Sequence, residues 1–139
     1  MNSTSLLMHE LNQKIRLLTK EMNERLSKHG LYHSQWMILF CLQKYGSMTQ
    51  TSLWKYLNVE APTVTRTLTR LEKSGWVIRK LGTDKREKVV VLTEKAKETL
   101  PDVEQTVRTF EQDMTKRLSQ EQITNLRELL GMLGTNETE

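Results

Sequence analysis

Residues 49–92 constrain what this chain can fold into more than any other stretch, because their local patterns change in a definite order. A short helix with a polar start is predicted for residues 49–57 and a second helix for residues 62–74. Proline suits the first turn of a helix, and Gly75 follows the last turn of the second one. Residues 58–61 form a turn between them, so the segment predicts a helix-turn-helix.

Two runs rich in β-forming residues come next, at residues 76–81 and 88–92. The polar residues 82–87 join the two runs, which are therefore predicted to pair as a hairpin with a basic tip. A helix-turn-helix followed by such a hairpin is the outline of a winged helix-turn-helix. That outline points to duplex DNA as the partner.

Charge is distributed unevenly along the chain. Residues 60–90 carry eight Lys and Arg against four acidic residues, and the first 59 residues carry seven against three. Residues 101–139 are acidic, with four basic and eight acidic side chains. The net charge of +4 therefore combines a basic N-terminal part, up to residue 90, with an acidic C-terminal part. A basic face of this kind fits a polyanion, and a solvated face without a partner is the alternative.

Length and composition limit the class of protein. A chain of 139 residues with 37% hydrophobic residues fits one domain, or one domain with a helical appendage. No apolar run reaches 18 residues and no signal-peptide pattern stands at the N-terminus, so no membrane partner is expected. Cys41, the single cysteine, cannot form a disulfide within the chain. The protein is predicted to be cytoplasmic.

Helices are also predicted on both sides of residues 49–92. Residues 5–28 form an amphipathic helix that Gly30 ends. Residues 33–44 form a second helix with a polar start, whose stretch 36–42 is apolar on all sides, so this helix is expected to be fully packed. Thr93 is the N-cap of a third helix. Pro101 interrupts that helix, either as a kink or as the start of a fresh helix.

The last helix begins at a capping box formed by Ser119 and Gln122. It carries an apolar stripe, as does the first helix, and such stripes must bury against another surface. A second copy of the chain is the expected partner, and packing of the terminal helices on each other within one chain is the alternative. The residues assigned to dimerisation are Leu7, Leu11, Ile15, Leu18, Ile123, Leu126 and Leu130.

The expected fold is mainly α with a small β-hairpin wing. Residues 31–98 form the winged helix-turn-helix domain, and residues 5–30 and 99–133 form the flanking dimerisation helices. Residues 134–139 are expected to be a disordered tail.

The second helix of the helix-turn-helix has two faces. Val64, Leu68 and Leu71 share the face that packs on the core, whereas cationic residues share another face, which would line the major groove. Arginine can bond bidentately to guanine there, although a cationic stripe can also be merely solvated. The residues assigned to DNA contact on this helix are Pro62, Thr63, Thr65, Arg66, Thr69, Arg70 and Lys73.

The hairpin tip supplies a second set of DNA contacts. Arg86 is predicted to enter the minor groove, whose negative potential attracts guanidinium groups. Asp84 is expected to hold Arg86 or a neighbouring arginine by a charge-assisted bond. Lys85 and Lys88 would contact phosphates. An ordinary polar turn is the alternative.

The chain resembles the MarR family of bacterial transcription regulators over residues 5–133. The resemblance rests on Leu31 with Ser34-Gln35-Trp36, on residues 49–53, 61–66 and 71–76, and on the wing motif Asp84-Lys85-Arg86, followed by residues 91–96. It implies a homodimer joined through its terminal helices. It also implies a pseudo-palindromic operator, bound as a repressor that a ligand or an oxidant releases.

Residue by residue, the resemblance extends to Thr63, Thr65, Arg66 and Arg70 on the recognition helix and to Asp84 and Arg86 on the wing. Three positions depart from the family pattern: Trp54 replaces a small residue, Ala96 replaces a frequent glycine, and Pro101 lies inside the fifth helix. Trp54 is expected to alter packing under the recognition helix. Pro101 is expected to affect the pocket between the dimer helices and the DNA-binding lobe.

Candidate sensing residues are few. Cys41 lies among apolar residues, where a thiol is inert, so a core role is expected for it. His29 and His33 have the spacing of a helical metal pair, but Gly30 separates them, so no metal and no cofactor are predicted. A small-molecule effector pocket is placed at Tyr32, Trp36 and Phe40, with plain core packing as the alternative.

No set of residues typical of an enzyme is visible, so catalysis is not expected. The predicted function is that of a homodimeric repressor that binds a specific duplex operator. The alternatives are an architectural winged-helix protein without sequence preference, and a thiol- or metal-responsive switch.

Overall fold

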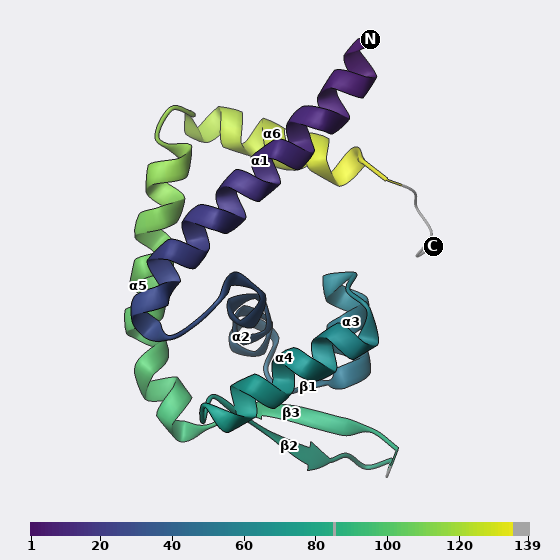
Figure 1. The fold of residues 1–139 in the computed structure, drawn as a ribbon, viewed down its shortest axis with the longest axis vertical. Coiled ribbons are helices and arrows are strands. Elements are labelled where there is room, and N and C mark those ends of the chain that lie inside the picture. The colour runs from purple at the N-terminus through teal and green to yellow at the C-terminus, as the bar shows by residue number, and fades with distance from the viewer. Residues whose placement is uncertain (85, 135–139) are drawn as a thin grey trace.

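The computed structural model describes residues 1–84 and 86–134. This part of the chain forms six α-helices and a small antiparallel sheet (Figure 1). The mainly α fold with a hairpin wing is confirmed. The elements are α1 (Ser3–Leu26), α2 (His33–Tyr45), β1 (Met48–Thr49), α3 (Gln50–Leu57), α4 (Ala61–Lys73), β2 (Val77–Leu81), β3 (Lys88–Leu92), α5 (Glu94–Thr115) and α6 (Gln120–Met132).

The two helices of the helix-turn-helix begin and end close to the positions that their capping and turn residues predict. The Thr49 side chain accepts a hydrogen bond from the Ser52 amide and caps α3. Asn58 ends α3 in the left-handed conformation, with a φ of 56°, which asparagine tolerates better than most residues. Ala61 belongs to α4 and not to the preceding turn, because proline at position 62 suits the first helical turn.

The wing is a hairpin in which Val77 pairs with Leu92 and Leu81 with Lys88. Strand β1, which the sequence pattern did not predict, pairs through its two residues with Val90 and Val89 of β3. Two residues are too few to produce an alternating pattern. Trp76 lies just before β2 and its carbonyl accepts from the Thr93 amide, so the wing is bonded to the start of α5.

The hydrophobic core gathers around α2, which contacts α1, α4 and β3. Leu39 on α2 and Leu68 on α4 are fully buried. Burial of each such side chain contributes about 1.5–3 kcal/mol. The expectation that α2 is apolar and packed on all sides is wrong at Phe40, which is 40% exposed. Its ring lies 5.9 Å from the Lys44 ammonium, at the open side of the helix.

Helix α5 continues through Pro101, so a fresh helix start at that residue is excluded. Pro101 is exposed, as is Lys97 one turn earlier. The Lys97 carbonyl, which loses its helical donor at the proline, can therefore bond to water. The predicted caps at Thr93 and Ser119 are both present, and Ser119 forms its capping box with Gln122.

The N-terminal part of α1 and all of α6 lie at the end of the molecule opposite the wing (Figure 1). Within the described chain, α1 buries only Met22 and Leu26, and α6 buries none of its residues. The predicted tail lies outside the described residues except for Gly134. Nowhere in the described chain is a helix both long and apolar enough to span a bilayer.

Candidate nucleic-acid interface

The cationic face of α4 is open to solvent along its whole length. Arg66, Arg70 and Lys73 are exposed on it, together with Pro62 and Thr63. Val64, Leu68 and Leu71 recur at helical spacing and are buried. The cationic residues lie on another face of the same helix, so the burial of the apolar face directs them toward solvent. The guanidinium of Arg66 donates to the Thr63 hydroxyl at 3.4 Å, a long contact that a base edge could displace.

Threonines on α4 present methyl groups and acceptor lone pairs rather than hydroxyl protons. Thr65 donates its hydroxyl proton to the Ala61 carbonyl, and Thr69 donates to the Thr65 carbonyl, each at 3.0 Å. Thr65 is exposed, whereas Thr69 is half-buried on the side of the helix that faces the wing. An exposed threonine methyl suits contact with the methyl group of thymine.

At the wing tip, the side chain of Arg86 is solvated and its backbone is held by a hydrogen bond. The side chain of Arg86 is 94% exposed. Its backbone amide donates to the Asp84 carboxylate at 3.0 Å, whereas the guanidinium Nε lies 3.8 Å from the same oxygen. Asp84 therefore holds the tip mainly through the main chain and leaves the guanidinium directed outward. Lys88 is exposed at the start of β3, and Lys85 lies outside the described residues.

An ion pair joins the wing to the recognition helix. Arg79 on β2 donates to both carboxylate oxygens of Glu72 on α4, at 3.0 and 3.4 Å, and to the Thr69 hydroxyl at 3.4 Å. The hydrogen bonds from Arg79 hold the pKa of Glu72 below its ordinary value. The wing and α4 are thus fixed relative to each other by a bidentate contact.

Sequence reasoning missed this pair, although a signal for Arg79 exists. Alternate residues of a strand share a face, so Arg79 lies on the same side of β2 as the buried Val77. A charged residue on the inner face of a strand needs a partner. The identity of that partner comes from another element and only the packing reveals it.

The residues proposed as an effector pocket separate into two places. Trp36 and Phe40 line a cavity of about 280 Å³ between α2 and α5, which Val107 and Arg108 also line. Tyr32 is 62% exposed and lies instead in a groove between α1, α2 and α4. The structure therefore brings together Trp36 and Phe40 but not Tyr32.

The candidate sensing residues lie in ordinary structural surroundings. Cys41 is fully buried, and burial raises the pKa of its thiol despite an opposing effect of Lys44. His29 bonds to the Thr106 hydroxyl at 2.8 Å, and desolvation, followed by the charge of Lys28, lowers its pKa. Burial lowers the pKa of His33 as well. Among the described residues, no three His, Cys, Asp or Glu side chains could hold a metal ion together.

An outward cationic helix after a tight turn, fixed to a hairpin with an arginine tip, defines the class of winged helix-turn-helix DNA-binding regulators. The family model of the MarR family matches residues 31–88. The Bacillus subtilis (strain 168) protein YwoH, an uncharacterized HTH-type transcriptional regulator, is 52% identical over 108 residues, which cover 78% of this chain and 79% of YwoH. The chain belongs to the MarR family and is a DNA-binding transcriptional regulator.

Solved structures agree with this assignment. A MarR mutant from E. coli in complex with operator DNA has a TM-score of 0.81 and 30% identity, covering 94% of this chain and 93% of that one. The overoxidized form of AbfR bound to DNA has a TM-score of 0.73 and 28% identity, covering 91% of this chain and 93% of that one. Both similar proteins were captured on DNA.

The Glu72–Arg79 pair predicts a pH-dependent contribution to stability. Because the folded-state pKa of Glu72 lies below its ordinary value of 4.5, the carboxylate stabilises the folded protein above that value. This contribution is lost as the pH falls through the folded-state pKa. Urea unfolding at equal protein concentration should therefore find Glu72→Gln less stable than the parent near pH 7, with a difference that shrinks as the pH falls below 4.5.

Glu98→Gln is the matched control, since Glu98 is an exposed residue of α5. Its unfolding curves should follow those of the parent at every pH. A Glu72→Gln difference that stays constant between neutral and acidic pH would contradict the assigned pair.

Proposed function

We propose that this regulator is a homodimeric repressor that binds a pseudo-palindromic operator and is released by a small molecule. The observation that carries the proposal is the open cationic face of α4 beside the braced arginine of the wing. A helix of this kind fits the major groove, and the arginine tip fits the adjacent minor groove. Operator binding by the similar E. coli protein supports the same use of the fold here.

The proposal of a dimer is supported by two apolar faces that residues 1–84 and 86–134 leave uncovered. Leu7 and Ile15 on α1 are 48% and 53% exposed, and Leu126 and Leu130 on α6 are each 47% exposed. Exposed leucine and isoleucine side chains that recur along one helix face are typical of an interface. Leu11, Leu18 and Ile123, which are assigned to the same interface, are half-buried in the described chain.

A dimer also explains how short helices could achieve operator specificity. One copy of α4 spans only part of one major groove. Two copies related by a twofold axis would read two half-sites about 34 Å apart, which is one turn of the duplex. The palindromic symmetry of the proposed operator follows from the symmetry of the protein.

For effector release, the cavity at Trp36 and Phe40 is the proposed binding site. Its volume of about 280 Å³ is near the lower limit for sites that bind small molecules, about 300 Å³. It lies between α2, which contacts α4, and α5, which connects the wing to α6. A ligand that separates α2 from α5 would therefore change the spacing of the two recognition helices.

The proposed function is tested by selecting binding sequences from randomised duplex DNA at near-physiological salt. An enriched inverted repeat with half-sites about one helical turn apart is the expected result. Binding without enrichment, with affinity that depends only on salt, would support the architectural alternative instead.

Arg66 and Arg70 should determine which bases the protein prefers in its operator. On the selected operator, Arg66→Ala and Arg70→Ala should each cost about 1–3 kcal/mol of binding and relax the sequence preference at particular base pairs. Lys95→Ala, an exposed change on α5, is the control that should leave the preference intact. Equal weakening on the operator and on scrambled DNA would assign both arginines to phosphate contacts.

Leu130→Glu should break the dimer. A carboxylate on the apolar face of α6 would be buried without a partner in the dimer, at a cost of several kcal/mol. Light scattering should then find the 16.3 kDa chain as a monomer, with its helical circular dichroism largely retained because α6 buries no residue within the described chain. Thr124→Glu adds the same charge to an exposed residue of α6 outside the apolar set and should leave the dimer intact. A dimeric Leu130→Glu variant would contradict the assigned interface.

A further inference from the structure

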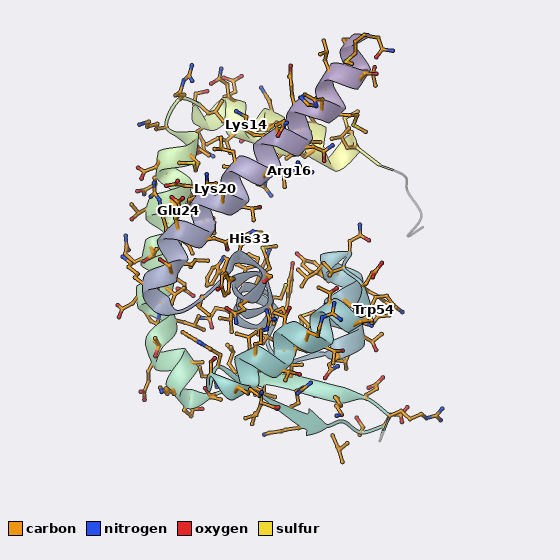
Figure 2. All side chains as sticks on the ribbon, viewed as in Figure 1. Lys14, Arg16, Lys20, Glu24, His33 and Trp54 are labelled. Carbon is orange, nitrogen blue, oxygen red and sulfur yellow. The ribbon has the colours of Figure 1, made fainter. Side chains whose placement is uncertain are left out.

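A hollow of about 300 Å³ lies between the recognition helix and the wing. Its floor is the first part of α3, through Gln50, Thr51 and Trp54. One wall is the wing-facing side of α4 at Thr65, and the other wall is the wing, where Arg86 and Lys88 line it. Trp54 lies on α3 within the same lobe as the wing (Figure 2).

The DNA backbone has to cross this hollow if α4 and the wing are both engaged. The major groove and the adjacent minor groove are separated by one sugar-phosphate strand. When α4 occupies the first groove and Arg86 enters the second, that strand must pass between the two elements. The Arg79–Glu72 pair keeps this separation constant, since it ties β2 to α4.

The chemistry of the lining suits a phosphate. Arg86 and Lys88 supply positive charge, and Thr51 supplies a hydroxyl group that can donate to a phosphate oxygen. Thr65 lines the hollow without donating to it, because its hydroxyl proton is bonded to the Ala61 carbonyl. Glu87 also lines the hollow and is its acidic member. The first turn of α3 belongs to this lining, and the leading N–H groups of a helix have no carbonyl partner within the helix, although the Ser52 amide is already bonded to the Thr49 hydroxyl.

Gln50 is the feature that the proposed function leaves unexplained. Its side-chain oxygen is buried and has no hydrogen-bond partner among the described residues. A buried polar group without a partner destabilises a folded protein. A phosphate offers no donor for this oxygen, so Gln50 can bond to a phosphate only through the N–H groups of its amide. Rotation of the amide exchanges its oxygen and nitrogen, so the group can direct N–H donors into the hollow.

Trp54 forms the edge of the floor. It is half-buried against the core, and the Lys55 ammonium lies 5.7 Å from its ring centroid. A second hollow, lined by Asn58 and Pro62, lies on its other side. Trp54 therefore stands between two concave surfaces at the start of the recognition helix, where a deoxyribose next to a seated phosphate could pack on the indole.

We propose that the hollow between α4 and the wing seats one backbone phosphate of the duplex, with Gln50 donating to it and Trp54 packing on the adjoining deoxyribose. The inference rests on the proposed function, because it assumes that α4 and the wing engage DNA together. It assigns affinity to α3, a helix outside the recognition helix and the wing. Phosphate contacts carry no base information, so this contribution is the same on every sequence.

The test is Gln50→Leu, which keeps the approximate size of the side chain and removes its polar groups. DNA affinity should fall about five- to tenfold, as expected for one lost hydrogen bond to a charged group. The fall should be equal on the selected operator and on a scrambled duplex. Thermal stability should be unchanged or raised, because the variant removes an unpaired buried oxygen.

Methylphosphonate substitution locates the contact on the DNA. Each phosphate of the operator is replaced in turn by a neutral methylphosphonate, and binding of the parent and of Gln50→Leu is compared. One position should weaken the parent and have a much smaller effect on Gln50→Leu, since the two changes remove the same contact. The exposed Gln105→Leu on α5 is the matched control and should behave as the parent.

Trp54 is tested by fluorescence in Trp36→Phe/Trp76→Phe, a variant that retains one indole. Iodide quenching of Trp54 should decrease when the protein is saturated with duplex DNA. Unchanged quenching would overturn the role of Trp54. Unchanged affinity of Gln50→Leu, on a duplex that the parent still selects, would overturn the phosphate seat and leave the proposed function standing.

Discussion

The rest of the structure depends on burial of the apolar face of α4. Val64, Leu68 and Leu71 are all buried against a core built around α2. Because the helix repeats every 3.6 residues, fixing this face also fixes the direction of Arg66 and Arg70. No additional interaction is required to turn the cationic side outward. The burial that stabilises the folded domain therefore also directs the cationic face of α4 toward solvent.

The wing is positioned by the burial of Val77, Val90 and Leu92 in the common core and by a polar contact with α4. Ile78 and Leu81 on β2 are exposed, so the hairpin buries little apolar surface on that side. The bidentate pair between Arg79 and Glu72 compensates by connecting the hairpin to α4. If α4 and the wing enter two grooves as proposed, a fixed distance between them favours DNA binding, since less motion has to be lost in the complex. The hollow at Gln50 lies between these same two elements.

At the end of the molecule opposite the wing, apolar side chains stay exposed in the described chain instead of joining the core. Helices α1 and α6 carry leucine-rich faces that the described chain does not cover, whereas α2 and α4 bury theirs. We interpret the uncovered faces as the surface that a second copy covers. The long helix α5 connects this end to the wing, beginning at the Thr93 cap and continuing through Pro101. A change at either end could therefore be transmitted along one rigid element.

The sequence by itself determined the order of the elements and their outward faces, because caps, turns and helical periodicity act over a few neighbouring residues. The Thr93 and Ser119 caps, the turn at Asn58 and the buried stripe of α4 all followed from such local signals. The sequence did not determine the Arg79–Glu72 pair, the strand β1, the exposure of Phe40 or the unpaired amide of Gln50. These depend on groups contributed by other elements. Only the tertiary structure decided them, because a polar or apolar side chain acquires its partners when distant segments pack together.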